Sequence, residues 1–330
     1  MNPVTLDAGP DQGLAWHYGD PLGEQRRFGQ GAGAVDLGNR AVVTIAGADG
    51  LKYLDVMSTQ RLVTLASGDA ATAYFLDPRG HVTFDLHLAA TDGLVWAWTA
   101  PGRGAALAEW LEQMKFRYDV TVAARPDIAL VWLAPGVTPP ADCPLRAGDQ
   151  PDLLGGTEAF VPRDRLDAVL ATTAPAGVWA YEARRIAAGI PRTGVDTDDR
   201  TIPNELGVPS CAVALDKGCY PGQETVAKIY NLGQPPRRLV RLHLDGSAET
   251  FVPPGTPLAA DDGSTVGRLG AMAYHWELGP IGLGLVRRDL QATAVTAGGV
   301  AAALENLVDP DAGRHVRPDL PSRRGRPSLL

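Results

Sequence analysis

The chain has 330 residues, 45% of them hydrophobic and 21% charged, which predicts two or three domains that bury a large core. Its formal net charge of −8 argues against a general nucleic-acid-binding protein, because phosphate neutralisation needs a basic surface, so we expect no direct DNA binding. No apolar stretch is long enough to span a bilayer, and the first residues lack the pattern of a secretory signal. We therefore expect a cytoplasmic protein without a membrane partner.

The first third of the chain predicts short strands alternating with helices. Residues 33–45 suit a turn that leads into a β-branched strand, and residues 49–57 have apolar positions at helical spacing. Further on, residues 94–98 favour a strand and residues 104–116 favour a helix.

Between these elements, residues 73–88 predict a β-hairpin. The turn Asp77-Pro78-Arg79-Gly80 has Asp first, Pro second and Gly fourth, which is favourable turn chemistry. The segment after it alternates strictly, so one face is apolar and the other is polar. The polar face carries His81, Thr83, Asp85 and His87.

The middle of the chain, residues 127–162, is rich in Pro and Gly, and we expect strands near residues 129–133 and 159–161. Residues 179–188 predict a helix that ends at Gly189. The aromatic residues Tyr74, Trp96 and Trp98 are interpreted as core rather than as a stacking platform.

A domain boundary is predicted at Pro235-Pro236. Beyond it, short strands with Gly and Pro between them recur up to about residue 308 and favour a small antiparallel barrel or sandwich. The Arg- and Pro-rich tail at residues 309–330 suits a disordered terminus, and we expect no RNA contact by it.

The cysteines and histidines predict neither a disulfide framework nor a metal site. Cys143, Cys211 and Cys219 form no CxxC pair, and the six histidines do not supply the missing ligands at zinc-finger spacing. An odd number of thiols without a secretory context is typical of a reducing compartment.

The most informative segment is DKGCYPGQE, residues 216–224. Cys219 lies in a turn flanked by Gly and Pro, and a short helix starting near Gly222 would put its thiol close to a helix N-terminus. That helix end and the cation of Lys217 both favour a thiolate over a thiol. The segment therefore predicts a reactive cysteine, and an inert buried cysteine in a loop is the alternative.

This motif, KGCYPGQE at residues 217–224, resembles the signature of YgfZ-type folate-binding proteins, which belong to the glycine-cleavage aminomethyltransferase (T-protein) superfamily. That group includes a mitochondrial iron–sulfur assembly factor. Further segments are similar to the family, from about residue 14 to residue 308: WHYGDP at 16–21, VDL at 35–37, YEARRIAAGIP at 181–191, IPNEL at 202–206 and IGLGLVRRD at 281–289.

The resemblance implies an α+β fold in which a ring of mixed α/β folate-binding domains is joined to a small C-terminal antiparallel β-barrel. The implied domains are residues 1–234, the aminomethyltransferase-like region of two interleaved subdomains, and residues 235–308, the barrel. Tetrahydrofolate or a derivative is the implied cofactor.

The resemblance also implies site residues. Asp85 matches the acidic residue that the family presents to the folate, although a solvent-facing strand edge is the alternative. Glu205 is a candidate for the pterin amino groups or a carboxylate at a helix start. Arg185, with Arg184, is a candidate for the folate glutamate tail or a cover for a helix surface. From the cysteine motif, the implied folate-binding residues are Tyr220, Gly222 and Gln223, and the implied catalytic residues are Cys219 and Lys217, together with Asp85.

The departures from the aminomethyltransferases bear on function. Those enzymes have an acidic residue where this chain has Ala187 and Ala188, and paired acids where it has Phe84 and Asp85, and they lack the cysteine. The resemblance therefore implies a folate-binding accessory protein that supports assembly or repair of iron–sulfur enzymes, including tRNA-modifying ones, with Cys219 as a redox or cluster-handling thiolate. Its implied partners are a folate and iron–sulfur client or assembly proteins.

Two other functions stay open. A tetrahydrofolate-dependent one-carbon transferase or demethylase would need a proton-handling group, and Asp85 is the candidate. A scaffold with a vestigial cavity would need neither a folate nor the thiol.

Overall fold

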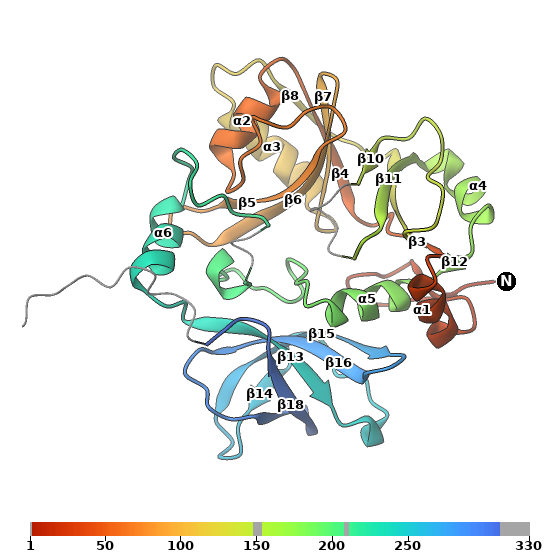
Figure 1. Cartoon of the computed structure of the whole chain (residues 1–330), viewed down its shortest axis with the longest axis vertical. Helices are drawn as coiled ribbons and strands as arrows, with labels where there is room; N and C mark the ends of the chain where they lie inside the picture. The colour runs from red at the N-terminus through yellow and green to blue at the C-terminus, as the bar shows by residue number, and fades with distance from the viewer. Residues whose placement is uncertain (1, 148–153, 208–210, 311–330) are drawn as a thin grey trace, which may run out of the picture.

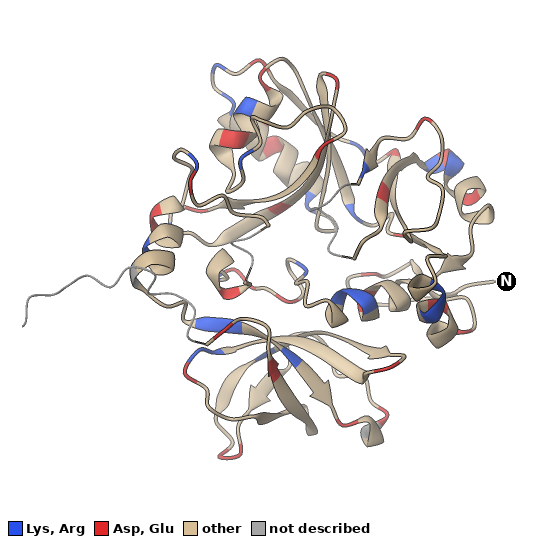
Figure 2. Cartoon of the chain, in the orientation of Figure 1, with Lys and Arg blue, Asp and Glu red and all other residues tan. Residues whose placement is uncertain are grey.

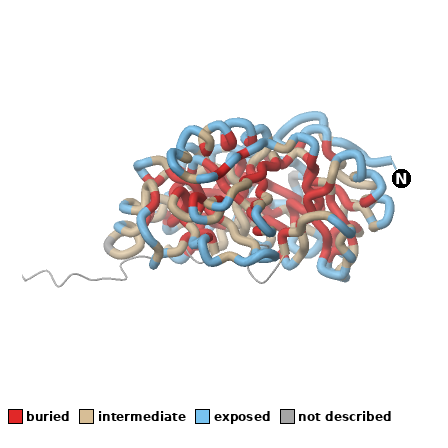
Figure 3. Tube along the Cα trace, turned by 90° about the horizontal axis from the view of Figure 1, so that it is seen from above, coloured by how far each residue is buried: buried red, intermediate tan, exposed pale blue. Residues whose placement is uncertain are grey.

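The computed structural model describes residues 2–147, 154–207 and 211–310 of the chain. It has three parts around a common centre, namely two open sheets side by side and a closed β-barrel opposite them (Figure 1). Acidic and basic residues are interspersed over all three parts (Figure 2). Buried residues run through the interior, and exposed residues are concentrated in the outer loops (Figure 3).

The first sheet consists of five antiparallel strands in the order β5 (Ala70–Leu76), β6 (Val82–Thr91), β7 (Leu94–Thr99), β4 (Ala41–Ala46) and β8 (Thr121–Ala124). Two helices, α2 (Gly50–Met57) and α3 (Gly104–Met114), pack on one face. Apolar side chains of β6 such as Leu86 and Leu88 are fully buried against them. The opposite face of β6 carries the polar residues.

The predicted hairpin is confirmed, as are the strand and the helices expected around it. The Asp77 carboxylate accepts hydrogen bonds from the backbone N–H groups of Arg79 and His81 and so holds the turn. Because β6 lies between β5 and β7, Asp85 is in the interior of the sheet and is buried. The alternative interpretation, a solvent-facing strand edge, is therefore wrong.

The second sheet has the strand order β10 (Leu145–Arg146), β11 (Thr157–Pro162), β9 (Ile128–Leu133), β3 (Ala34–Asp36) and β12 (Pro175–Ala176). Only the pairing of β3 with β12 is parallel among the described strands of this sheet. All six residues of β9 are buried, which explains why its sequence lacks a polar alternation. The strands expected near 129–133 and 159–161 are confirmed.

The remaining elements connect and cover the sheets. Helix α5 (Val178–Ala187), which confirms the predicted helix, lies between the sheets and the barrel (Figure 1). The other described elements are β1 (Val4–Thr5), β2 (Ala15–His17), α1 (Pro21–Gly29), η1 (Arg163–Arg165), α4 (Leu166–Ala171), η2 (Pro203–Glu205), α6 (Gln223–Leu232) and η3 (Gly246–Ala248). Within the described ranges, no helix has both the length and the apolar character needed to cross a membrane.

The C-terminal part is a closed antiparallel barrel whose strands are β13 (Arg237–Leu244), β16 (Gly279–Arg287), β15 (Thr265–His275), β14 (Pro257–Ala259), β17 (Ala294–Ala297) and β18 (Val300–Asn306). Pairing of β13 with β18 closes the ring. The barrel strands begin directly after Pro235-Pro236. The predicted α+β class with a small C-terminal β-barrel is confirmed, whereas the exact domain boundaries stay a prediction. The predicted disorder of the tail concerns residues that lie, from 311 onwards, outside the described ranges.

Candidate functional site

A cavity of about 300 Å³, called here the first cavity, lies against the polar face of the first sheet. Its walls come from β5, β6 and β7, from β10 and β11 of the second sheet, and from α5 with the loop that follows it. Leu307, just beyond the last barrel strand, also lines it. Both sheets, α5 and the segment beyond the last barrel strand therefore contribute to one cavity.

A second cavity of about 650 Å³ lies at the end of the β5–β6 hairpin. The two cavities share five lining residues: Asp85, Ala100, Pro101, Arg192 and Thr193. Asp85 is thus the carboxylate at which the two spaces meet.

Asp85 is held by two side chains from neighbouring positions. Thr99 Oγ1 on β7 donates to Asp85 Oδ1 at 2.9 Å, and His87 Nε2 lies 3.4 Å from Asp85 Oδ2. Burial opposes ionisation, but the interactions with His87 and Thr99 outweigh it and hold the pKa of Asp85 below its usual range. The cavity wall therefore presents an ionised hydrogen-bond acceptor.

An aromatic wall stands beside this carboxylate. The rings of His87 and Trp98 stack at 3.8 Å with an angle of 6° between their planes, and Trp98 Nε1 donates to Glu158 Oε2 at 2.7 Å. Tyr74 and Trp98 are buried, as expected for core residues, yet both also line the first cavity. A flat aromatic wall next to an acceptor suits a flat, apolar ligand that carries N–H donors.

A buried ion pair completes the polar side of the first cavity. Arg146 Nη1 on β10 donates to Glu158 Oε2 on β11 at 2.9 Å, and Arg146 Nη2 donates to Thr72 Oγ1 on β5 at 2.7 Å. The sequence analysis missed Arg146 and Glu158. The available signal was a charged residue, Glu158, next to the apolar run of residues 159–162.

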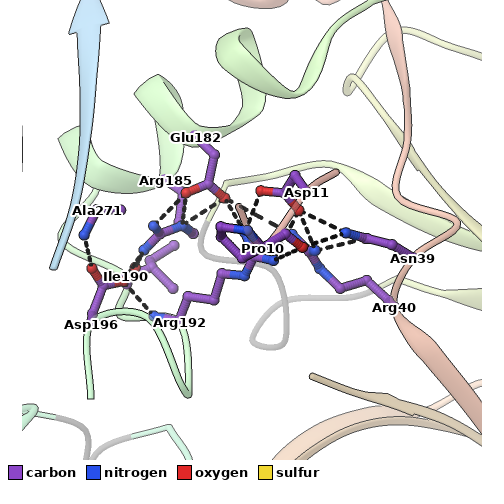
Figure 4. Close-up of polar contacts among 10 residues, drawn as sticks. All are labelled: Pro10, Asp11, Asn39, Arg40, Glu182, Arg185, Ile190, Arg192, Asp196 and Ala271. Atoms are coloured by element: carbon purple, nitrogen blue, oxygen red, sulfur yellow. Dashed lines mark hydrogen bonds and ion pairs between the residues drawn. The ribbon is translucent and has the colours of Figure 1, made fainter. Parts of the chain in front are cut away.

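A network of three arginines and three carboxylates borders the same cavity (Figure 4), and its members are Asp11, Arg40, Glu182, Arg185, Arg192 and Asp196. The short pairs are Asp11 with Arg192 at 2.6 Å, Glu182 with Arg185 at 2.6 Å and Arg185 with Asp196 at 2.7 Å. All six residues are buried. The three positive and three negative charges balance within the network, as burial of so many ionised groups requires.

Arg185 is a member of this network and lines the first cavity. Its side chain is only 4% exposed, so the alternative interpretation as a cover for the α5 surface is wrong. Its guanidinium donates to Glu182 and Asp196. These two carboxylates compensate the positive charge of Arg185. Binding of a folate tail by Arg185 stays a prediction.

Glu205 is not among the described residues that line either cavity. Its carboxylate pairs with Arg237 at the start of β13, at 2.8 and 2.9 Å, and accepts the N–H of Ile202. These contacts match the alternative interpretation, a carboxylate at the start of a helical turn. They also attach the segment before the barrel to its first strand.

The cysteine motif does not line the two cavities. The described lining residues include none of Cys219, Lys217, Tyr220, Gly222 and Gln223. Cys219 is exposed, which excludes the interpretation as a buried cysteine. The predicted helix that follows is α6, with Gly222 as its N-cap. The structure thus does not bring Cys219 and Asp85 together in one pocket.

Each remaining motif residue has a contact within the protein. The Lys217 ammonium binds backbone carbonyl oxygens at the end of α2 and lies 5.2 Å from the ring centre of the buried Tyr220. Gln223 Nε2 lies 3.4 Å from Lys217 O. Their predicted roles in folate binding or catalysis stay predictions.

Cys211 lines the first cavity, and the sequence analysis gave it no role. It is partly buried, and burial raises the pKa of its thiol. No spacing pattern in the sequence distinguishes it from Cys143. Across the described residues, no group of three or more His, Cys, Asp or Glu side chains is arranged to hold a metal ion.

Known proteins are similar to this chain both in sequence and in structure. Residues 237–308 match the family described as CAF17, C-terminal beta-barrel domain. An aminomethyltransferase of Xanthomonas axonopodis pv. citri is 27% identical over 268 residues, which are 69% of this chain and 72% of that protein. The mitochondrial iron–sulfur cluster assembly factor IBA57 of Homo sapiens is 25% identical over 71% of this chain and 73% of its own length.

Among solved structures, the glycine cleavage system aminomethyltransferase T from Bartonella henselae superposes with a TM-score of 0.76. The match covers 91% of this chain and 92% of the other at 18% sequence identity. The expectation of an aminomethyltransferase-like arrangement is therefore confirmed at the level of the fold.

Proposed function

We propose that the chain, which is similar to aminomethyltransferases and to IBA57, binds a folate and supports the assembly or repair of iron–sulfur enzymes, including enzymes that modify tRNA. The observation that carries the folate part is the ionised, buried Asp85 beside a flat aromatic wall in the first cavity. The name of the relative IBA57 supports the iron–sulfur part.

The residues of the first cavity fit a tetrahydrofolate in their chemistry. A carboxylate accepts hydrogen bonds from ring N–H and amino groups, and such bonds are among the strong ones because the acceptor is charged. The stacked His87 and Trp98 offer a flat wall against which a heteroaromatic ring can lie. A bound tetrahydrofolate would supply a carrier for one-carbon units, and Asp85, His87 and Trp98 would orient it.

Glu205, Tyr220, Gly222 and Gln223 contact other parts of the protein, so the proposed folate position depends on Asp85 and not on them. Arg185 would act through the shape of the cavity, because its charge is paired with Glu182 and Asp196.

Cys219 would serve a different step, because it is exposed and is not among the described residues that line the first cavity. Iron–sulfur clusters are usually held by four ligands, so one exposed thiolate cannot hold a cluster alone. In the proposed role, Cys219 supplies one ligand to a cluster that is shared with a client or assembly protein. The cluster is then cargo of the protein rather than its resident group.

A second function, tetrahydrofolate-dependent one-carbon transfer or demethylation of an amine, is favoured by one observation. His87 lies 3.4 Å from Asp85, so the pair can exchange a proton with a ligand in the cavity. The alanines at positions 187 and 188, where the aminomethyltransferases have an acidic residue, count against it. Turnover of a methylated amine in the presence of tetrahydrofolate would support this function over the first.

The test is calorimetric titration of the purified protein with folinic acid, beside the variants Asp85→Asn and Cys219→Ala. We expect equal affinity for the wild type and Cys219→Ala. For Asp85→Asn we expect about tenfold weaker binding or more, since a hydrogen bond to a charged group contributes about 1.5–3 kcal/mol. Asp92→Asn, an exposed carboxylate at the end of the same hairpin strand, is the matched control.

Unchanged affinity in Asp85→Asn would remove Asp85 from the site. Absence of binding by the wild type would remove the folate from the proposed function and favour the scaffold alternative.

A further inference from the structure

The loop that carries Cys219 is attached to the first sheet and its helices on both sides of the thiol. On the N-terminal side the attachment is Lys217, whose side chain is 2% exposed. On the C-terminal side it is Gly222, the N-cap of α6. Cys219 itself is exposed between these two points, and a Cβ added to its neighbour Gly218 would meet no atom within 4 Å.

The Lys217 ammonium has three N–H donors, and three backbone carbonyl oxygens receive them. These are Asp55 O, Ser58 O at 2.7 Å and Gln60 O at 3.0 Å. All three carbonyls lie in the last turn of α2 or just beyond it, where a helix leaves carbonyl groups without intrahelical partners. Lys217 therefore closes the C-terminal end of α2 from a loop more than 150 residues away.

The surroundings of this ammonium limit its effect on the thiol. The Asp55 carboxylate lies 3.7 Å from Lys217 Nζ, and the three carbonyl oxygens present the negative ends of their dipoles to it. The field of the cation is therefore largely compensated close to its source. A charge compensated in this way does little to stabilise a thiolate two residues along the chain.

The second attachment is a contact between two backbones. Gly222 has φ +77°, and a Cβ there would lie 2.6 Å from Asp77 O and 3.0 Å from the Cα of Gly80. In turn, a Cβ on Gly80 would lie 2.8 Å from the Cβ of Thr225 on α6. The loop and the turn of the β5–β6 hairpin therefore fit together only because both positions are glycine.

We propose that Lys217 is a positioning residue. It holds the Cys219 loop on the end of α2, and it affects the thiol by fixing the position of this loop and not by the electrostatic effect of its charge. The proposal rests on the proposed function in so far as Cys219 is the functional thiol. It replaces the sequence-based explanation of Lys217, in which a neighbouring cation favours the thiolate. A rigid loop lowers the entropic cost of presenting the thiol to a partner.

The test compares Lys217→Met with Lys52→Met, a change of an exposed lysine on the same helix α2. Amide hydrogen exchange is measured in peptides that cover residues 54–62 and 216–222. The pH dependence of Cys219 alkylation by iodoacetamide is followed by mass spectrometry on the same samples.

We expect exchange in both peptides to become about tenfold faster or more in Lys217→Met, because buried hydrogen bonds from a charged group are lost. We expect the pH dependence of Cys219 alkylation to stay that of the wild type. Exchange and alkylation in Lys52→Met should match the wild type. Lys217→Gln, which keeps two N–H donors without the charge, should recover part of the protection.

A shift of the alkylation profile by about half a pH unit or more towards higher pH in Lys217→Met would overturn the proposal, because it would show a direct effect of the charge on the thiol. Unchanged exchange in both peptides would overturn it as well. If Lys217→Met does not fold, Lys217→Gln gives the same test, because it also removes the charge, with faster exchange than in the wild type and an unchanged alkylation profile expected. Neither measurement uses a folate or a client protein. The result can therefore be interpreted even if the proposed function is wrong.

Discussion

At the scale of single residues, two cysteines can serve as probes of the two candidate sites, the first cavity and the exposed loop. Cys219 is exposed on its loop, whereas Cys211 lines the first cavity and its thiol has a pKa raised by burial. Because alkylation needs both thiolate and access, the two thiols should respond differently to a ligand. Cys211 becomes a probe of the cavity, and Cys219 is its internal control.

We expect bound folinic acid to slow alkylation of Cys211 and to leave Cys219 unaffected. At a free concentration ten times its Kd, the slowing should be about tenfold, because only the unliganded fraction keeps the cavity open. The measurement is site-resolved labelling with iodoacetamide at pH 8.5, where more of the Cys211 thiol is ionised than at neutral pH.

The variant Asp85→Asn at the same folinic acid concentration is the control, and it should lose most of the protection. Equal slowing at both cysteines would mean that the ligand does not discriminate the cavity from the loop. Full-speed labelling of Cys211 in a sample that binds folinic acid by calorimetry would put the ligand outside the first cavity.

At the scale of elements, the β5–β6 hairpin connects the two candidate sites. Its polar face presents Asp85 and His87 to the first cavity, and its turn packs against the loop of Cys219 through Gly80 and Gly222. A substitution in the turn should therefore disturb the cysteine loop more than the first cavity.

The turn glycine allows a matched comparison. Gly80 and Gly93 both lie in hairpin turns next to β6 with positive φ, +89° and +73°, but a Cβ on Gly93 would meet no atom within 4 Å. Alanine at either position should cost about 1–2 kcal/mol from the left-handed backbone. Gly80→Ala should cost about 1–3 kcal/mol more, because its Cβ would overlap Thr225. Urea unfolding measures both values, and equal costs would contradict a tight contact between turn and α6.

The sequence predicts an element well when the residues that determine it are close together in the chain. The hairpin was predictable because Asp77 and Gly80 set its turn and because the period of two in β6 is visible in 10 residues. The second sheet was harder, since β3 pairs with β9 and β12, strands far from it along the chain. The site followed the same rule. Asp85 was predicted as a site residue from its strand and the family resemblance, and its role stays a prediction. The partner of Glu205, Arg237, is 32 residues away, and no local pattern indicates it.

At the scale of the whole molecule, the buried ion-pair network connects the N-terminal segment, α5 and the loop beyond it, and the barrel. Asp11 comes from the N-terminal segment, Glu182 and Arg185 from α5, and Asp196 from the loop beyond it (Figure 4). Asp196 Oδ1 also accepts the N–H of Ala271 on β15 at 2.6 Å and so reaches the barrel. Loss of one member should therefore weaken the association of parts and not only one contact.

Asp11 pairs with both Arg40 and Arg192, so its removal leaves these two buried arginines without that negative charge. Asp11→Asn should destabilise the fold by about 3–5 kcal/mol at pH 7, the cost of breaking a buried pair from one side. Although burial opposes ionisation, the two arginines hold the pKa of Asp11 well below its usual range. The stability that Asp11 contributes is therefore complete above its unfolded pKa of about 3.9 and is lost as the pH falls through the lower, folded value.

Urea unfolding of the wild type and of Asp11→Asn should thus differ by a constant amount from pH 8 to pH 5, and the gap should narrow only below about pH 4. Asp7→Asn, an exposed carboxylate in the same segment, is the control and should match the wild type throughout. A gap that already closes between pH 7 and pH 5 would mean that Asp11 titrates near neutrality, which an intact pairing with Arg40 and Arg192 forbids. The pH at which the gap closes therefore measures how firmly the N-terminal segment is held by Arg40 and Arg192.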